Sequence, residues 1–444
     1  MEKMIFDPIC AVATPRGFSA LAVIRCSGMN VLERVMPFLK LNKNKIEPWR
    51  LYLTEFTVGD ELIDELTVVF YKAPRSYTGE DMVEFISHGS PMVLKLIIET
   101  LFKAGFREAM PGEFTKRAVM NGKMNLLKAE SIEVLINAKT RKAHEAASFI
   151  YQGKLGHSIE AIRQLLIKAM AEVEVELNYP GEVEASTEAV YSLLMEVKRL
   201  LEELVAHGEN GIALTEGIRT VIAGRPNVGK STLLNALLRK DRAIVTDIPG
   251  TTRDTIEEAL SIDGTYFRII DTAGIRKSDN PIEKLGINRS KQEIEQADLV
   301  IFMVDLTDPE QDLKLFESIK PRLKRYVLLG NKLDLAKCHE AVELCISANS
   351  GESLRDLEKK MLEKTADLSN PYEGELFITE RQKALSNRAL DYLNETLEAL
   401  VGGVTMDIIS SLLHQTIKIL DELTGKHLQE DLLDTIFKNF CVGK

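Results

Sequence analysis

The segment GRPNVGKS, residues 224–231, constrains the fold of this chain more than any other. It has the spacing G-x-x-x-x-G-K-S/T, and it lies between the apolar run IRTVIA and the helical run KSTLLNALLRK. A phosphate-binding loop requires this strand–loop–helix context, because loop N–H groups and a helix N-terminus together surround the anion. The segment therefore predicts an α/β domain that binds a nucleotide through its phosphates.

The alternation of strands and helices continues to about residue 370. The apolar runs FRIID, LVIFMVD, YVLLGNK and LCISA each end at a polar loop, which is typical of a parallel sheet with functional residues after its strands. Three of these loops carry DTAG (271–274), NKLD (331–334) and SAN (347–349). A carboxylate at Asp334 can accept both the N1–H and the 2-amino group of guanine, a pair that adenine lacks. We therefore expect a Ras-like P-loop domain that binds GTP.

Each loop has an expected task in this site. Lys230 would reach the β- and γ-phosphates, Ser231 would hold Mg²⁺, and the segment GTTRD (250–254) would bring Thr252 to the same ion. Asp271 would support the Mg²⁺ shell, and the Gly274 N–H would sense the γ-phosphate. The predicted GTP-binding residues are Asn227, Val228, Gly229, Lys230, Ser231, Thr232, Thr246, Asp247, Ile248, Pro249, Gly250, Thr251, Thr252, Asp271, Thr272, Ala273, Gly274, Asn331, Lys332, Asp334, Ser347, Ala348 and Asn349.

The segments before and after the α/β domain have a different pattern of apolar residues. Residues 1 to about 115 mix short β-type runs with turns and one helical stretch, PMVLKLIIETLFKAG, which indicates an α+β domain. Apolar residues at spacings of three and four predict amphipathic helices over about 120–210 and again over about 376–444. We expect that neither helical part buries its apolar face alone. We therefore expect one helical domain, with the α/β domain inserted between its two parts.

Composition limits the environment and the partners. The 444 residues contain no apolar run of about 20, and the first 20 lack the pattern of a signal peptide, so we expect a cytoplasmic protein without membrane contact. The net charge of −11 means that any RNA contact needs a local basic patch or a second protein. Five scattered cysteines without a C-x-x-C spacing argue against a disulfide framework and a zinc site, and we expect most of them to be reduced core thiols.

Four further segments resemble one family, the MnmE (TrmE) tRNA-modification GTPases. They are ATPRGFSALAVIRCSG (13–28), PRSYTGEDMVEFISHG (74–89), PGEFTKRAVMNGKMNLLKAE (111–130) and the terminal IFKNFCVGK (436–444). The resemblance spans the whole chain. It implies a tetrahydrofolate-binding, dimerising N-terminal domain over 1–119, a helical domain over 120–212 and 373–444, and a TrmE-type G domain over 213–372.

The resemblance also implies an activity. The homodimer would hydrolyse GTP to GDP and act with an FAD protein of the MnmG/GidA family, in a heterotetrameric complex, on certain tRNAs. The product would be an aminomethyl or carboxymethylaminomethyl group at C5 of the wobble uridine. A different class stays open, because a phosphate loop alone cannot exclude it: a GTP-regulated switch in RNA or ribosome assembly that modifies nothing.

Several residue roles follow from the resemblance alone. Arg25, Glu84 and Lys123 fall at folate-contacting positions, with 5,10-methylene- or 5-formyl-tetrahydrofolate as the implied ligand. Cys441 matches a functional terminal cysteine, and Glu283 matches a catalytic glutamate. The residues implied to hold K⁺ are Asn227, Thr246, Ile248 and Thr251.

The sequence also departs from patterns that these classes share. Ile275 occupies a place where many GTPases carry a glutamine that orients the attacking water, which raises the question of what activates the water here. Ser90 replaces a second glycine after His88-Gly89, and NYPGEVEAS (178–186) replaces a more acidic stretch of the family. Because the last two lie at connections, we expect only local changes there.

Overall fold

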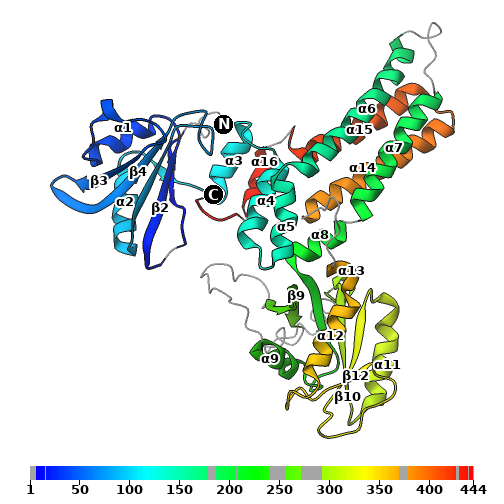
Figure 1. Cartoon of the computed structure of the whole chain (residues 1–444). Helices are drawn as coiled ribbons and strands as arrows, with labels where there is room; N and C mark the ends of the chain where they lie inside the picture. Colours follow the sequence, from blue (N-terminus) through cyan, green and yellow to red (C-terminus); the bar gives the residue numbers. More distant parts are fainter. Residues whose placement is uncertain are drawn as a thin grey trace, which may run out of the picture. The chain divides into compact units, whose positions relative to one another are not determined.

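The computed structural model describes residues 7–15, 17–178, 187–206, 208–240, 257–271, 293–369, 379–426, 430–438 and 440–443 (Figure 1). The chain forms two compact units, residues 1–133 with 420–444 and residues 134–419. Helices α4 (Leu126–Asn137) and α15 (Met406–Thr424) run from one unit into the other. The domain boundaries expected at 119, 212 and 372 stay a prediction, because a compact unit can contain parts of more than one domain.

The first unit contains a six-stranded sheet in the order β3-β4-β5-β2-β1-β6. Neighbouring strands are antiparallel except β1 and β6, which are parallel. One face is covered by α1 (Val31–Val35) and α2 (Pro91–Lys103), the helix expected at this place, over a core that includes Ile24, Phe56 and Phe85. The strands are β1 (Ile9–Val12), β2 (Ser19–Ser27), β3 (Leu51–Val58), β4 (Glu61–Tyr71), β5 (Met82–Gly89) and β6 (Arg107–Glu108), with short 3₁₀ turns η1 (Met36–Phe38) and η2 (Lys43–Lys45).

A buried ion network fixes the loop 74–81 against helix α3 (Glu113–Met120). The guanidinium of Arg117, only 4% exposed, donates to Glu80 at 3.0 Å and to Glu113 at 2.9 Å, and Arg107 also pairs with Glu113. Burial acts to raise the pKa of Glu113, but the hydrogen bonds from Arg107, the Met110 N–H and Arg117 outweigh it and lower that pKa. A buried charge is tolerated only with such partners, so the network holds this loop in one place.

The C-terminal helix α16 (Glu430–Phe437) belongs to the same unit. Phe437 and Phe440 are buried in one cluster with Val119 and Leu126, and their ring centroids lie 4.8 Å apart. The end of the chain is therefore packed on the N-terminal unit through aromatic side chains.

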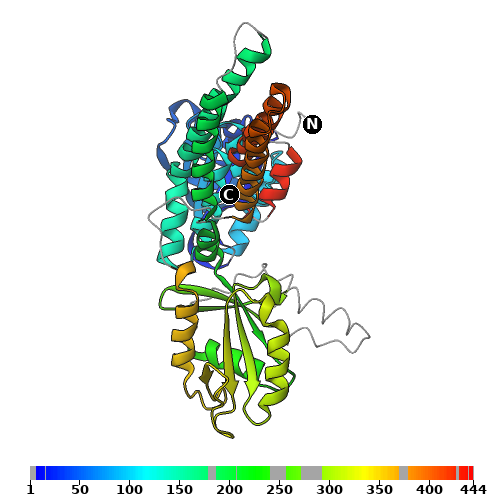
Figure 2. The same cartoon turned by 90° about the vertical axis from the view of Figure 1, so that its right-hand side faces the viewer.

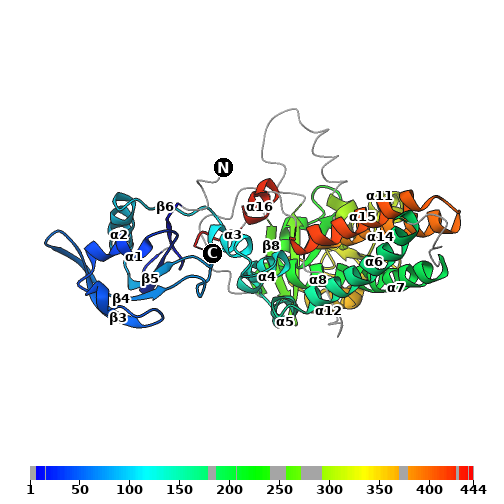
Figure 3. The same ribbon diagram turned by 90° about the horizontal axis from the view of Figure 1, so that it is seen from above.

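The helical part of the second unit contains α5 (Arg141–Tyr151), α6 (Lys154–Asn178), α7 (Thr187–Ala206), α8 (Gly208–Glu216) and α14 (Glu380–Val401). Helix α7 packs along both α6 and α14 (Figure 3). The apolar pattern over 126–150 predicts a helix, and the structure divides it into α4 and α5. The break has a local cause, because the Thr140 hydroxyl accepts from the Ala143 N–H at 3.1 Å and caps a new helix. None of the described helices is long and apolar enough to cross a membrane.

The second unit also contains a six-stranded sheet in the order β12-β11-β10-β7-β9-β8. The predicted strands are present and parallel, but an additional edge strand, β8, runs antiparallel to β9. Asp263 and Gly264 connect these two strands with φ angles of 45° and 77°, the geometry of a tight hairpin, which forces the antiparallel direction. The strands are β7 (Ile218–Ala223), β8 (Glu257–Ile262), β9 (Thr265–Asp271), β10 (Leu299–Asp305), β11 (Tyr326–Asn331) and β12 (Leu344–Cys345).

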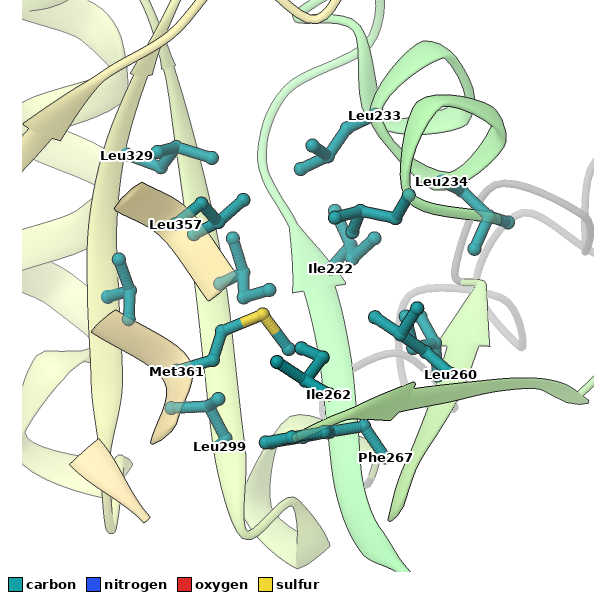
Figure 4. Packing of buried hydrophobic residues seen from close by; sticks show 14 of the residues in the cluster. Ile222, Leu233, Leu234, Leu260, Ile262, Phe267, Leu299, Leu329, Leu357 and Met361 are labelled. Atoms are coloured by element: carbon teal, nitrogen blue, oxygen red, sulfur yellow. The ribbon is translucent and has the colours of Figure 1, made fainter. Parts of the chain in front are cut away.

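Helices cover both faces of this sheet (Figure 2). On one face α9 (Lys230–Lys240) and α12 (Leu354–Lys364) bury an apolar core that includes Ile222, Leu233 and Met361 (Figure 4). On the other face Phe316 of α11 (Pro309–Ile319) packs against Phe302. Short turns η4 (Lys320–Arg322) and α13 (Ala366–Ser369) complete the described elements of this part.

One expectation about cysteines is wrong. Cys338 and Cys345 form a disulfide with their Cα atoms 5.7 Å apart, whereas Cys10, Cys26 and Cys441 are free thiols. The spacing of the two cysteines in the sequence does not indicate this pair. They come together because the loop between β11 and β12 folds back on itself. The disulfide therefore closes the segment that joins the NKLD loop to the SAN loop.

Candidate functional site

The phosphate loop joins β7 to α9 at the expected place, and two glycines make its path possible. A Cβ on Gly224 (φ +144°) would lie 2.7 Å from the carbonyl oxygen of Met303. A Cβ on Gly229 (φ +102°) would lie 2.3 Å from the Nδ2 atom of Asn331. Only glycine allows the loop to pass so close to β10 and to the NKLD loop.

The lysine side chain of the phosphate loop folds back onto the loop itself. The Lys230 ammonium donates to the carbonyl oxygens of Gly224 at 2.9 Å and Arg225 at 2.8 Å. Asn227 at the tip is exposed and has a φ of 64°. Ser231 and Thr232 are exposed in the first turn of α9, where N–H groups and the helix dipole favour an anion. The loop can thus surround a phosphate with both backbone donors and a cation.

The side-chain amide of Asn331 connects three loops. Its Nδ2 donates to the Val228 carbonyl at 2.8 Å, and its Oδ1 accepts from the Ala348 N–H at 3.0 Å. The buried Ser347 hydroxyl donates to one oxygen of the exposed Asp334 carboxylate at 2.7 Å. The GRPNVGKS, NKLD and SAN loops therefore meet, and one Asp334 oxygen is held in position by Ser347.

An ion pair beside these loops was not expected from the sequence. Lys332, at a φ of 71°, donates through its ammonium to Asp305 at 2.5 Å. Burial acts to raise the pKa of Asp305, but the bonds from Lys332 and Thr307 outweigh it and lower the pKa. The only signal in the sequence is that Asp305 ends the apolar run LVIFMVD, as the other site residues end theirs.

Arg225, the second residue of the phosphate loop, is engaged elsewhere. Its guanidinium donates to the fully buried carboxylate of Asp312 at 2.5 Å and also to Gln311 and Asp308. These bonds raise the pKa of Arg225. In this structure Arg225 therefore fixes the loop to α11 and does not extend toward a bound phosphate.

The remaining predicted nucleotide and metal residues cannot be placed. The side chain of Asp271 lies outside the described residues, and so do the whole of Thr246, Asp247, Ile248, Pro249, Gly250, Thr251, Thr252, Thr272, Ala273, Gly274 and Glu283. The roles expected for them, including those toward Mg²⁺ and K⁺, stay predictions. Asn349 is described and exposed directly after Ala348.

The first unit brings together two of the three residues expected at a folate. Arg25 on β2 and Glu84 on β5 are directly opposite in the sheet, and Arg25 Nε donates to Glu84 Oε1 at 2.8 Å. The Tyr71 hydroxyl donates to Glu84 Oε2 at 2.8 Å, and burial together with this bond raises the pKa of Tyr71 to about 12. The Arg25 guanidinium lies over the rings of Tyr77 and Phe114, at 5.0 and 5.6 Å. The three aromatic residues were not predicted from the sequence.

Lys123 has a different partner. It is exposed, and its ammonium donates to the Pro74 carbonyl at 2.8 Å. Pro74 begins the loop that also carries Tyr77. Lys123 is therefore joined to this site through the loop 74–81, and its hydrogen bond does not go to Arg25 or Glu84.

The C-terminal tail reaches the same cluster. Arg25 Nη1 donates to the Gly443 carbonyl at 3.1 Å. Cys441 carries an exposed free thiol, and its carbonyl accepts from the Gly112 N–H at 3.3 Å. The cysteine expected to be functional thus belongs to the N-terminal unit and lies two residues before an Arg25 contact.

The geometry of Asp334 leads to a test of base recognition. Replacing Asp334 by Asn converts one acceptor oxygen to an amino donor while Ser347 remains able to hold the other atom. We expect GTP binding to weaken about 10- to 100-fold, the range for one lost hydrogen bond to a charged group, and xanthosine triphosphate binding to improve. Competition titration of the two nucleotides measures both changes.

Asp263→Asn is the matched control, because it removes the same charge from an exposed turn with a φ of 45°, which asparagine also adopts. It should leave the preference for GTP unchanged. An unaltered preference in Asp334→Asn would show that this carboxylate does not read the base.

Comparison with known proteins places this geometry in a family. A family model described as the MnmE helical domain matches residues 126–441, and one described as the GTP-binding protein TrmE N-terminus matches residues 8–123. The protein named tRNA modification GTPase MnmE from Thermotoga sp. (strain RQ2) is 44% identical over 99% of this chain and 100% of its own length. The protein of that name from Aquifex aeolicus is 39% identical over the same shares.

Among solved structures, the G domain of FeoB from Methanococcus jannaschii covers 33% of this chain at 26% identity, with a TM-score of 0.26. The relatives match this chain from end to end, and the two family models together cover most of it. Its described phosphate and base loops have the arrangement that a GTPase needs. The chain therefore belongs to the MnmE (TrmE) family of GTPases.

Proposed function

We propose that this GTPase modifies tRNA, and that it acts with a flavoprotein partner of the MnmG/GidA family on the wobble uridine of certain tRNAs. Identity of 44% along the whole chain with a protein named for tRNA modification is the observation that carries the proposal. The tail on Arg25 supports it, because an assembly switch needs no cysteine held beside an Arg–Glu pair. A cytoplasmic location follows from the proposed substrate.

For GTP hydrolysis, the proposed roles fall on the described residues Lys230, Ser231 and Asp334 and on Thr252, which lies outside the described residues. Lys230 and the start of α9 would bind phosphates, Ser231 with Thr252 would hold Mg²⁺, and Asp334 would read the base. Phosphoryl transfer depends mainly on positioning and charge neutralisation. Because Arg225 is bound to Asp312, it does not supply the positive charge in this structure.

A monovalent cation is the proposed substitute for an arginine. Asn227, exposed at the tip of the phosphate loop, presents a carboxamide oxygen of the kind that K⁺ accepts. Bound there with Thr246, Ile248 and Thr251, K⁺ would supply positive charge beside the phosphates. Since Ile275 cannot orient water, Glu283 is the proposed acceptor that positions it.

The Arg25–Glu84 pair is the proposed folate site. A carboxylate suits the N–H and amino edge of a pterin, and a cation such as Lys123 suits the glutamate tail. Each Glu84 oxygen already accepts one hydrogen bond, one from Arg25 and the other from Tyr71. Each carboxylate oxygen can accept a second one, so the pair can still bind a donor. We further propose that the homodimer forms through this N-terminal domain.

The acidic composition bears on how tRNA is held. With a net charge of −11, the chain as a whole repels a polyanion. We therefore propose that the flavoprotein partner or a local basic patch supplies most phosphate contacts, while this chain supplies GTP hydrolysis, folate and the tail.

Nucleoside composition tests the whole proposal. Digested tRNA from cells with and without the protein should differ in the modified wobble uridine. Cys441→Ser should lose the modified nucleoside, because a hydroxyl cannot replace the thiol, while GTP turnover remains, since Cys441 lies in the other compact unit from the phosphate loop. Identical nucleosides with and without the protein would instead favour the assembly switch.

Salt replacement tests the hydrolysis mechanism. An arginine finger is worth about 10³–10⁵ in rate, so replacing K⁺ by Na⁺ should slow GTP turnover by orders of magnitude if K⁺ does this work. Glu283→Ala should bind GTP normally and hydrolyse it far more slowly. Equal turnover in both salts, together with turnover that survives Glu283→Ala, would require another group to position the water.

Calorimetry tests the folate site. Titration of the full chain with 5-formyl-tetrahydrofolate should release or absorb heat, and Glu84→Gln should weaken binding because an amide presents only one acceptor atom. Glu47→Gln is the control, since Glu47 is an exposed carboxylate that pairs with Arg50 on the surface. A folded protein that gives no heat with this ligand would contradict the assignment.

A further inference from the structure

We propose that Gly443 is a positioning residue, which together with Arg25 fixes the C-terminal tail so that the Cys441 thiol stays at the Arg25–Glu84 site. The proposal rests on the proposed role of Cys441 in modification. It assigns a task to the glycine of the terminal CVGK, which follows the cysteine by two residues. The tail is held by contacts of Gly112, Arg25 and Gly443. We call these contacts together the tail latch.

The first part of the tail latch is steric. Gly443 is buried and has a φ of +93°, a conformation that L side chains rarely adopt. A Cβ there would lie 2.7 Å from the Cα of Ala13 and 2.8 Å from the carbonyl oxygen of Val12. Both neighbours are backbone atoms at the end of β1, so they cannot move aside as a flexible side chain would. Glycine is therefore required for the tail to lie against this strand.

The second part is the hydrogen bond from Arg25. Its Nε is fixed on Glu84, whose other oxygen is fixed by Tyr71, and its ring contacts are with Tyr77 and Phe114. The guanidinium is planar, so these contacts also fix the direction of Nη1, which donates to the Gly443 carbonyl. The Arg25 side chain is only 14% exposed, which strengthens a charged hydrogen bond.

The third part lies on the other side of Cys441. Phe437 and Phe440 are buried, and the Gly112 N–H donates to the carbonyl of Cys441 itself. Gly112 also packs so closely on Phe437 that an added Cβ would lie 2.9 Å from the Phe437 carbonyl oxygen. The exposed cysteine is thus held between an aromatic anchor at Phe440 and the Arg25 contact at Gly443.

This arrangement has a chemical consequence. A thiol on a loose terminus samples a large volume, whereas one held between two anchors keeps a high effective concentration at a nearby site. Arg25 serves both purposes, since the same guanidinium binds the Glu84 carboxylate and the tail. Loss of the glycine should therefore impair modification although the thiol is still present.

The mobility of the tail tests the proposal directly. A nitroxide methanethiosulfonate label on Cys441 of the full chain, with the spectrum of Cys441→Ser protein subtracted, reports motion by electron paramagnetic resonance. We expect a broad, immobilised spectrum in the parent chain and a sharp, mobile one in Gly443→Ala. Gly59→Ala is the control, because Gly59 also has a positive φ, 62°, in the same unit but nothing within 4 Å of an added Cβ. Equal mobility in all three proteins would overturn the proposal.

A semisynthetic rescue separates the tail latch from general damage. Residues 1–440 as a thioester can be ligated at Cys441 to the peptide Cys-Val-D-Ala-Lys. A D-residue adopts positive φ without strain, and its methyl group points away from the position that collides with Ala13. This protein should regain both the immobilised spectrum and the modified nucleoside. Failure of the D-residue to restore the spectrum would show that the backbone of Gly443 is not what holds the tail.

The unlabelled Gly443→Ala protein then links position to function. We expect its modified wobble nucleoside to fall about tenfold or more, the factor for one lost hydrogen bond to a charged group. A mobile tail with full modification would overturn the positioning role, since the thiol would then work without being fixed. The resonance result does not depend on tRNA, so absence of any modification activity in the parent chain would contradict the proposed function and leave the tail latch intact.

Discussion

The candidate nucleotide site depends on the two hydrogen bonds made by the side-chain carboxamide of Asn331. This carboxamide is buried, and its two ends bind the backbone of the phosphate loop and of the SAN loop at 2.8 and 3.0 Å. Because these loops follow different strands, nothing local would keep them in register. Gly229 makes the contact possible by leaving room for the amide nitrogen. The loops proposed to bind the base and the phosphates are thus joined to each other in the structure without a ligand.

In the first unit, the guanidinium of Arg25 joins separate segments of the chain, as the amide of Asn331 does in the second unit. Arg25 reaches a neighbouring strand, two aromatic rings and the end of the chain at once. A planar group with several donors in fixed directions suits this task better than a lysine, whose ammonium is a single point on a flexible stem. The loop that carries Tyr77 is held in turn by the buried Arg117 network with Glu80 and Glu113.

Arginine placement also bears on how a GTPase without a switch glutamine can work. The loop arginine, Arg225, is bound to the buried Asp312, and this contact fixes the loop to α11. An arginine used to build a site is lost as a mobile source of charge at the phosphates. The proposed monovalent cation at Asn227 would supply that charge without a further side chain, which is consistent with a chemistry that depends mostly on electrostatics.

Local sequence patterns were enough to predict the elements whose causes are local. GRPNVGKS between a strand and a helix, polar motifs at the ends of apolar runs, and helical periodicity in the flanks predicted the α/β domain, its base loop and the α+β start, and the structure and comparisons confirmed the fold class. Features that depend on residues far apart in the chain became visible only in the folded structure. The β8 edge strand follows from a two-residue turn, the Cys338–Cys345 bond from a loop folding back, and the Arg25 contact to Gly443 spans 418 residues. A hydrogen bond across such a separation leaves no periodic or spacing signal, because only packing of the whole unit brings its partners together.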